Sequence, residues 1–237
     1  MRGTAGIQGE DWLNAQGIFD FETQGCRGLI ARLVRAPKGR GGNRLRVVAG
    51  SLGGRNLAPP PAGVRPTSDR VRESLFSILG DLSGDRVLDL YAGTGALGIE
   101  ALSRGAESLV AVDRAQTSVR VVDRNLRTLG VAERSEVMRM ECRAALRRLA
   151  DEGNRFDLVF LDPPYADFDD ISGVLDALVA CDILQPTGVV VVEGPKRHSL
   201  PRVAGLSVER TRKYGDTVIY WLGLDADESV AVNETNE

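Results

Sequence analysis

The chain has 237 residues, of which 43% are hydrophobic, so it is long and apolar enough for one domain of ordinary size with appendages. No apolar run approaches the roughly 20 residues that span a bilayer, and the N-terminus lacks a continuous apolar stretch, so we expect a soluble, cytoplasmic protein without a secretion signal. The three scattered cysteines and the single histidine argue against a disulfide framework, a metal site or a histidine-based triad.

The net charge of −3 does not by itself indicate a partner, but its distribution does. Between Thr23 and Ser68 every charged residue is basic, whereas the end of the chain is acidic. This asymmetry favours an anionic partner on one side, the alternative being a basic leader without a specific target. We expect a flexible basic extension over residues 1–42 and a disordered acidic tail over residues 225–237.

Residues 43–82 predict a β-hairpin followed by a helix. Strands are expected at Arg44–Ala49 and Arg55–Ala58, and the prolines that follow impose an extended connector. Thr67 or Ser68 then caps a helix that ends at Gly80. Its expected apolar face carries Val71, Leu75, Phe76 and Leu79, and its expected polar face carries Arg70, Arg72 and Glu73.

Residues 83–224 predict an α/β core, because strand and helix patterns alternate as they do in a parallel sheet covered by helices. The short turn at Tyr214–Asp216 demands antiparallel pairing of the last two strands. The expected strands are Arg86–Leu90, Ser108–Asp113, Ser135–Arg139, Phe156–Leu161, Gly188–Glu193, Leu206–Lys213 and Thr217–Leu222. The expected helices are Ala96–Arg104, Ala115–Leu129, Arg143–Asp151 and Asp170–Cys181.

The stretch Val87–Ile99 predicts a cofactor cradle made of a strand, a tight glycine turn and the start of a helix. Glycines in the turn remove the Cβ atoms that would keep a ligand from the backbone. The first free N–H groups of the helix point at whatever lies there. The candidate cofactor-binding residues of this stretch are Asp89, Tyr91, Gly93, Thr94 and Gly95.

Two cofactors fit this cradle. With Gly98, the glycines satisfy G-x-G-x-x-G, and Asp113 lies at roughly the 20-residue spacing of a dinucleotide site. However, Asp89 would repel a pyrophosphate, whereas a carboxylate there suits the cationic amino-acid end of S-adenosylmethionine (SAM). The downstream Asp162–Tyr165 motif also has no use in a dehydrogenase. A glycine turn without any ligand is the remaining alternative.

Acidic residues gather where predicted strands end, and parallel strands bring such ends to one ligand-binding edge. Asp113 is positioned to accept both hydroxyls of a ribose, the alternative being a cap for the helix that follows. Glu141 and Cys142 are expected beside the adenine, again with a helix cap as the alternative for Glu141. Arg114, next to Asp113, completes the candidate cofactor site.

The motif Asp162-Pro163-Pro164-Tyr165 is the most specific signal. Two prolines make a rigid loop with free carbonyl groups. The Asp162 carboxylate and the Pro163 carbonyl can each accept one hydrogen of an amino group on a base, which aims the nitrogen lone pair at a methyl donor. Tyr165 offers a flat face for an extruded base. The alternative is a proline-rich turn after a buried strand.

The chemistry that this arrangement predicts is in-line positioning of an amine against an activated methyl group. Positioning of two bound reactants supplies on the order of 7–11 kcal/mol at best. No covalent nucleophile is needed, so Cys142 and Cys181 are interpreted as structural thiols. We assign no general base, because the nitrogen becomes acidic once it is methylated.

The segments Arg46–Gly54, Arg65–Leu79, Leu88–Ala106 and Phe160–Tyr165 resemble, in order, the RsmD family of bacterial 16S ribosomal RNA guanine-N2 methyltransferases. The resemblance covers residues 44 to 223 and implies a Rossmann-like SAM-methyltransferase fold with a seven-stranded, mostly parallel sheet, its last strand antiparallel, and an N-terminal β-hairpin that docks on RNA. It implies SAM as the cofactor without a metal. The implied substrate is a guanine of the guanine-966 type in the small ribosomal subunit or its assembly intermediate.

The resemblance also bears on the arginines. Those of the hairpin are candidates for phosphate contacts, which give affinity without base identity. Around the capped helix start, helix capping with solvated charge is as good an interpretation as RNA contact. Lys213 and Tyr214 are placed at a hairpin tip bordering the base pocket. The candidate RNA-binding residues are Arg44, Arg46, Arg55, Arg65 and Arg70.

Alternative functions stay open at this point. The Asp-Pro-Pro-Tyr chemistry serves adenine N6 or cytosine N4 of DNA or RNA equally well, although the chain leaves little length for a separate target-recognition domain. A non-catalytic RNA-binding assembly factor would not need the intact motifs. A NAD-dependent oxidoreductase is disfavoured by Asp89. We expect the enzyme to act as a monomer.

Overall fold

The computed structural model describes residues 45–60 and 68–225. The predicted N-terminal extension and the acidic tail beyond Asp225 lie outside these ranges, as do Arg44, Arg65 and Thr67. Among the helices of the described ranges, none has the length and apolar character needed to cross a membrane.

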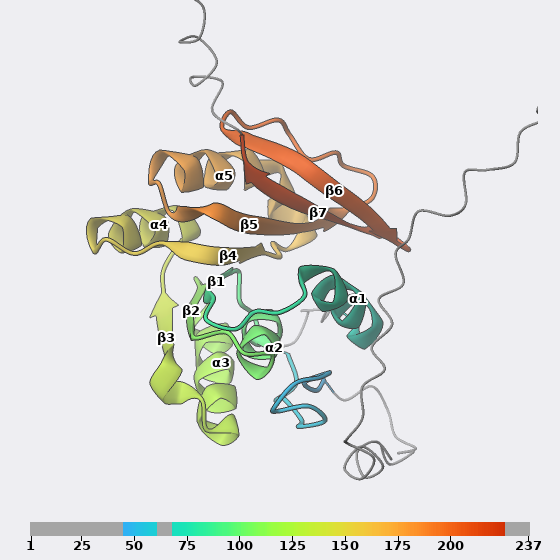
Figure 1. Cartoon of the computed structure of the whole chain (residues 1–237), viewed down its shortest axis with the longest axis vertical. Coiled ribbons are helices and arrows are strands. Elements are labelled where there is room, and N and C mark those ends of the chain that lie inside the picture. Colours follow the sequence, from blue (N-terminus) through green and yellow to red (C-terminus); the bar gives the residue numbers. More distant parts are fainter. Residues whose placement is uncertain (1–44, 61–67, 226–237) are drawn as a thin grey trace, which may run out of the picture. The chain divides into compact units, whose positions relative to one another are not determined.

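A seven-stranded sheet in the order β3-β2-β1-β4-β5-β7-β6 forms the centre of the structure (Figure 1). Strands β1 to β5 pair in parallel, β7 is antiparallel to β5, and β6 is antiparallel to β7. The predicted mostly parallel sheet with an antiparallel last strand is therefore confirmed. The strands are β1 (Arg86–Leu90), β2 (Ser108–Asp113), β3 (Ser135–Arg139), β4 (Phe156–Leu161), β5 (Leu184–Pro195), β6 (Leu206–Tyr214) and β7 (Thr217–Leu224).

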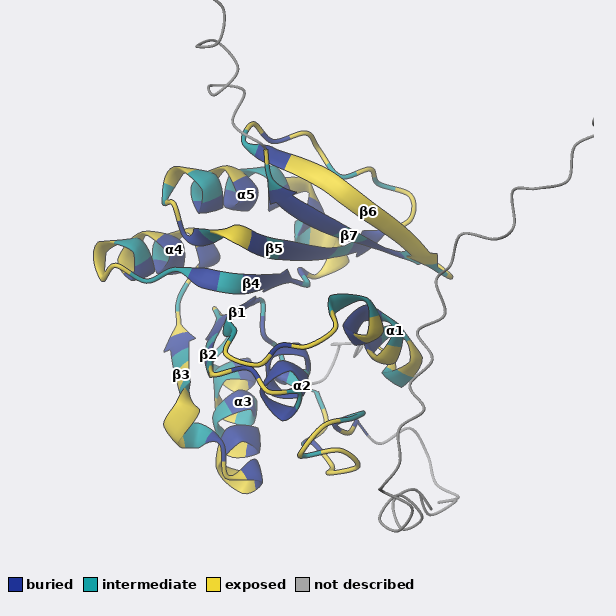
Figure 2. Ribbon diagram, viewed as in Figure 1, coloured by how far each residue is buried: buried dark blue, intermediate teal, exposed yellow. Residues whose placement is uncertain are grey.

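Helices cover both faces of the sheet, because side chains along each strand alternate between two apolar cores. Phe160 and Val191 belong to the core under the first three α-helices, whereas Leu161 and Val192 belong to the core under the last two. Figure 2 shows β4, β5 and β7 buried over most of their length and β6 exposed. The helices are α1 (Asp69–Leu79), α2 (Ala96–Ser103), α3 (Gln116–Leu129), η1 (Ala132–Arg134), α4 (Cys142–Asp151), η2 (Tyr165–Asp170) and α5 (Ile171–Ala180).

The predicted N-terminal hairpin is reduced to one antiparallel bridge, Arg46 with Asn56, and residues 45–60 form no regular strand. The amides of Val48 and Ala49 bond to the carboxylate of Glu100 on α2 instead, at 2.6 and 2.9 Å. The Glu100 side chain thus accepts hydrogen bonds from backbone N–H groups that would pair with the opposite strand in a longer hairpin. This exchange fastens the hairpin to α2.

Helix α1 begins and ends as predicted, because the Ser68 hydroxyl accepts the Val71 N–H and Gly80 follows the last residue. The expectation that Arg72 lies on its polar face is wrong. Arg72 is fully buried, 2.6 Å from Asp69 and 3.8 Å from the equally buried Glu100. A buried carboxylate requires a cation nearby, which explains an arginine on the inner face of α1.

Candidate active site

The glycine loop and the Asp-Pro-Pro-Tyr loop leave the sheet side by side. Strands β1 and β4 are neighbours, with Leu90 opposite Leu161, so the loops that follow them start at the same edge. On the other side, Leu90 lies opposite Val112, which places Asp113 at this edge too. The predicted convergence of the cofactor cradle and the Pro-Pro corner is therefore present in the sheet register.

The glycine loop is held in a left-handed backbone conformation. Tyr91, Gly93 and Gly95 have φ angles of 63°, 58° and 75°, and such an angle is costly for a residue with a side chain such as Tyr91. The Thr94 carbonyl accepts a 2.9 Å hydrogen bond from the buried amide of Asn125 on α3. The surrounding structure thus fixes the loop that is predicted to receive the cofactor.

Asp113 braces the same loop. Its Oδ2 accepts the Gly93 N–H at 2.9 Å and its Oδ1 accepts the Ala115 N–H at 2.8 Å. The alternative role as cap of α3 is wrong, because Ala115 occupies the N-cap position. Carboxylate oxygens have further lone pairs, so the half-buried Asp113 can still accept ligand hydroxyls.

Asp89 is a buried carboxyl group beside the cradle. Its Oδ2 accepts the Gly98 N–H at 3.0 Å. Burial raises its pKa from 3.8 to about 7, and the charges of Asp162 and Asp113 contribute to the same shift. Such a site favours a bound cation, because a positive charge would offset both the burial of the Asp89 carboxylate and its repulsion by the two nearby acids.

The remaining residues of the predicted cofactor site occupy different surroundings. Glu141 holds the N-cap position of α4 but makes no capping side-chain bond. The adjacent Cys142 is buried against Tyr91, and burial raises the pKa of its thiol to about 12, so it stays protonated at neutral pH. Arg114 is exposed and forms a 2.8 Å ion pair with Asp167 on η2, which links the end of β2 to the segment that begins at Tyr165. Contact of these residues with an adenine stays a prediction.

The Asp-Pro-Pro-Tyr loop emerges from the core instead of being sealed inside it. Asp162 is half-buried and Pro163 buried, whereas Pro164 and Tyr165 are exposed. The Tyr165 ring is 42% exposed, and its hydroxyl lies 2.8 Å from the Thr217 Oγ1 at the start of β7. The ring is therefore both accessible and held by its tip, as a stacking platform requires.

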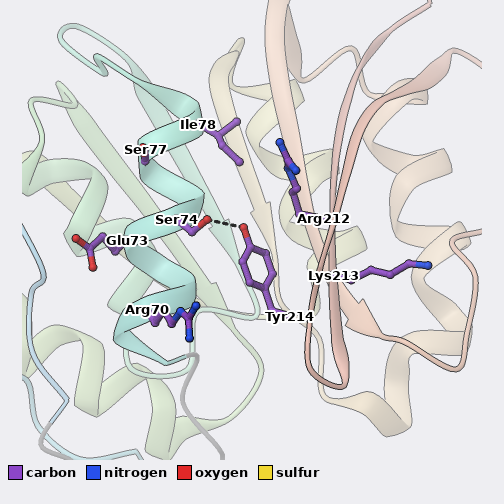
Figure 3. Close-up of a pocket in the computed structure, with 8 residues that line it drawn as sticks. All are labelled: Arg70, Glu73, Ser74, Ser77, Ile78, Arg212, Lys213 and Tyr214. Carbon is purple, nitrogen blue, oxygen red and sulfur yellow. Dashed lines mark hydrogen bonds between the residues drawn. The ribbon is translucent and has the colours of Figure 1, made fainter.

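A groove of about 560 Å³ separates α1 from the tip of the β6–β7 hairpin (Figure 3). The Tyr214 hydroxyl crosses it to the Ser74 hydroxyl at 2.6 Å. In Figure 3, Arg70 and Arg212 lie along the groove, while Lys213 extends away from α1. Because Tyr214 pairs with Thr217, which holds Tyr165, the groove adjoins the Asp-Pro-Pro-Tyr loop.

Comparison with known proteins gives the family. Residues 45–223 match the family model described as Conserved hypothetical protein 95. The chain belongs to the RsmD family. YlbH of Bacillus subtilis is 39% identical over 176 residues, which cover 73% of this chain and 95% of YlbH. The Ribosomal RNA small subunit methyltransferase D of Escherichia coli K12 is 34% identical over 193 residues, covering 77% of this chain and 91% of that protein.

Solved structures agree with this RsmD assignment. A hypothetical protein of Thermus thermophilus matches with a TM-score of 0.65 and 30% identity, covering 76% of this chain and 99% of that one. The structure of SMU.776 complexed with SAH matches with a TM-score of 0.56, covering 72% and 51%, and at 14% identity it shows the fold alone. The Rossmann-like fold of SAM-dependent methyltransferases, which the RsmD resemblance implied, is confirmed.

The arginines expected to bind RNA in an RsmD protein are only partly described. Arg46 and Arg55 are exposed on the hairpin, where Arg46 pairs with Asp69 at 2.9 Å and Arg55 donates to the Thr128 carbonyl at 2.9 Å. Arg70 is exposed on α1 and lines the groove. Arg44 and Arg65 lie outside the described residues. RNA contact by this set stays a prediction.

Sequence reasoning missed residues that the RsmD fold brings to the site. Glu193 ends the predicted strand Gly188–Glu193, so it carried the same signal as Asp89 and Asp162, an acid where a strand stops. Thr217 and Asn125 carried no such signal, because a hydroxyl at a strand start and an amide within a helix are common. Only the packing of distant segments reveals their contacts.

Proposed function

We propose that the protein transfers a methyl group from SAM to the exocyclic N2 amine of a guanine in 16S ribosomal RNA of the small subunit. The observation that carries the proposal is the adjacency of the two loops on β1 and β4, with Asp162 in electrostatic range of Asp89. The name of the Escherichia coli relative supports ribosomal RNA of the small subunit as the substrate class.

The residues of the cradle fit SAM. The buried Asp89, whose pKa is raised to about 7, favours the cationic amino-acid end, and Asp113 has acceptor capacity for the ribose hydroxyls. The positive φ angles of Gly93 and Gly95 keep the turn tight and free of Cβ atoms. When bound, SAM supplies a methyl group already activated by its sulfonium, so the protein needs no nucleophile of its own.

The chain's own part in the reaction is to hold and orient the amine. Asp162 and the Pro163 carbonyl accept the two amine hydrogens, which directs the nitrogen lone pair toward the cradle on the neighbouring strand. Tyr165, held by Thr217, stacks on the extruded base. With SAM held by Asp89, Asp113 and the glycine turn, the oriented nitrogen lone pair would accept the methyl group, S-adenosylhomocysteine would be the leaving group, and the methylated nitrogen would pass one proton to water. Orientation of this kind supplies on the order of 7–11 kcal/mol at best.

The RNA is held by exposed cations on several segments. Arg46 contacts Asp69 at the start of α1, Arg55 donates to the Thr128 carbonyl near the end of α3, and Arg70 and Arg212 line the groove. Such contacts bind phosphates without reading the base. Base identity therefore has to come from groups at the sheet edge.

The proposal is tested by methyl transfer from labelled SAM to small-subunit particles that lack the modification, with the modified base mapped by mass spectrometry. We expect one N2-methylguanine. Asp162→Ala should abolish transfer while leaving SAM affinity within a few fold, whereas Asp176→Ala on the exposed side of α5 should change neither. Label on an adenine or a cytosine, or none in RNA, would overturn the proposal.

A further inference from the structure

Glu193 lies beside the catalytic aspartate on the side away from the cofactor cradle. In β5, Val192 is opposite Leu161, so the next residue in each strand, Glu193 and Asp162, come side by side at the edge of the sheet. The cradle follows β1, the neighbour of β4 on the opposite side. A base whose amine is held by Asp162 and faces the cradle therefore extends toward Glu193.

Glu193 and Asp162 share one face of the sheet. Side chains alternate between the two faces along β5. Val191 of β5 and Phe160 of β4 both belong to the core under α1. Ile219, which is opposite Glu193 in β7, belongs to the same core. Glu193 is two residues after Val191, and Asp162 is two residues after Phe160, so both fall on this same face. Asp162 also acts electrostatically on Asp89 of β1.

The backbone at Glu193 is held by the same contacts that shape the catalytic loop. A Cβ on the next residue, Gly194, would collide with the ring of Phe168 on η2, so the strand and this segment pack in direct contact. One residue further, Pro195 is opposite Thr217, whose hydroxyl bonds Tyr165. Residues 193 to 195 thus lie next to the residues that hold the loop, and Glu193 is half-buried there.

The chemistry of this position distinguishes guanine from other bases that carry an amine. Guanine presents its N1–H next to its N2 amine, whereas the ring nitrogens beside the amines of adenine and cytosine are acceptors. An ionised carboxylate only accepts hydrogen bonds. Adjacent strands lie about 4.8 Å apart, a spacing that lets two carboxylates reach neighbouring donors on one base.

We propose that Glu193 is the specificity-determining residue, whose carboxylate accepts the N1–H of the target guanine while Asp162 and Pro163 hold its N2 amine. The inference rests on the proposed function and names how that site selects its base. The other acids at the edge are placed for the cofactor, since Asp89 and Asp113 accept N–H groups of the glycine turn and its helix.

The test compares guanine with 2-aminopurine, which keeps the N2 amine but lacks O6 and has an acceptor at N1; the Glu193 variants isolate the contribution of N1. Small-subunit particles are reconstituted with either base at the mapped target. For the wild type we expect kcat/KM for 2-aminopurine to be lower by about 100-fold or more, because a site built for a donor rejects an analogue lacking it. Glu193→Gln can donate its amide to N1, so the guanine preference should fall by about 10-fold or more.

Matched measurements separate specificity from structural damage. Glu193→Gln and Glu193→Ala should keep SAM affinity within about twofold by calorimetry, and Glu107→Gln, an exposed glutamate, should keep the wild-type preference. Equal use of the two bases by the wild type would overturn the inference even if both Glu193 variants failed to fold. An unchanged preference in folded variants would overturn it as well. If the wild type methylates no guanine, the proposed function itself fails.

Discussion

Asp89 illustrates how a binding residue lowers the stability of its own protein. Its pKa is about 7 in the folded protein and 3.8 as an ordinary carboxyl, so the folded state retains the proton more strongly. The contribution of Asp89 to the free energy of unfolding is therefore highest below about pH 4 and is lost as the pH rises to about 7.

Asp89→Asn removes this penalty. Above pH 7 we expect the variant to melt a few degrees higher than the wild type, and below pH 4 the difference should vanish. Its SAM affinity should fall at least about tenfold, since the amide cannot pair with a cation. Thermal melts from pH 4 to pH 8 and calorimetry check both, with Asp176→Asn as an exposed control. A variant that melts lower at pH 8 would contradict the burial argument.

Two helical glycines give opposite expectations for the same substitution. A Cβ at Gly98 would lie 2.5 Å from Leu109 Cδ1 and 3.1 Å from the Asp89 carboxylate, so Gly98→Ala should destabilise by about 1–3 kcal/mol. A Cβ at Gly173 would meet first the movable end of Arg143, so Gly173→Ala should be neutral or stabilising. Urea unfolding compares them, and equal effects would contradict the packing argument.

At this scale, the sequence allows acids at strand ends to be predicted but not buried charges. Asp89 and Asp162 follow apolar runs, and parallel strands bring their ends together whatever the rest of the chain does. In the sequence, Arg72 resembles a surface residue, because nothing near it in the chain indicates its ion pair with Glu100 on α2. Glu100 is equally hard to recognise, because the residues next to it in the sequence are apolar. Pairs of this kind become visible only once α1 lies on α2.

Among the elements, the N-terminal hairpin depends on α2 more than on itself. The Glu100 carboxylate accepts hydrogen bonds from two hairpin amides and forms an ion pair with Arg104 at 2.9 Å. The amide of Leu52 bonds to the Ser103 hydroxyl at 2.9 Å. Since α2 starts at the glycine turn, the hairpin and the turn that we propose binds the cofactor are fastened to the same short helix.

Glu100→Ala should release the hairpin. We expect a loss of at most about 3–5 kcal/mol of stability, because the buried Arg72 would lose its buried counter-charge and keep only Asp69. Hydrogen exchange at the amides of Val48 and Ala49 should accelerate well before that of the strands. Glu107→Ala, an exposed acid after the same helix, serves as the control. Unchanged protection at both amides would show that the hairpin is held elsewhere.

The bounds of the elements were predictable where one local signal dominates. Strands β1 to β4 coincide with the expected ranges. β1, β2 and β4 are short, largely apolar runs with an acid at or next to their ends, whereas β3 is a mostly polar stretch between two helices. Strand β5 is longer than Gly188–Glu193, since its first residues pair with β4 through a register shift near Pro186 that no period-two pattern reveals. The order of the strands was not predicted, because alternation alone does not fix it and the family resemblance implied only a seven-stranded, mostly parallel sheet.

Considered as a whole, the molecule carries a net negative charge yet is proposed to bind a polyanion. Binding of RNA therefore depends on where the cations lie, not on their number. Replacing Arg46, Arg55 and Arg70 together with Gln should weaken binding of small-subunit RNA and lower the slope of log affinity against log salt by about 2–3. Filter binding over a range of salt concentrations measures the slope.

The control for this experiment changes the charge by the same amount at other places. Arg124, Arg147 and Arg148 are exposed on α3 and α4. Their joint replacement by Gln should leave the slope close to that of the wild type. Equal slopes for the two triple variants would mean that the RNA responds to overall charge and not to the cations of the hairpin and α1.

The contact between Gly194 and the Phe168 ring has an evolutionary consequence. A side chain at position 194 and a large ring at position 168 exclude each other, so a substitution at one position restricts which residues the other can carry. Homologues that gain a methyl group at the first position should carry a smaller residue at the second. The two columns of a family alignment should therefore covary, although 25 residues of chain lie between them.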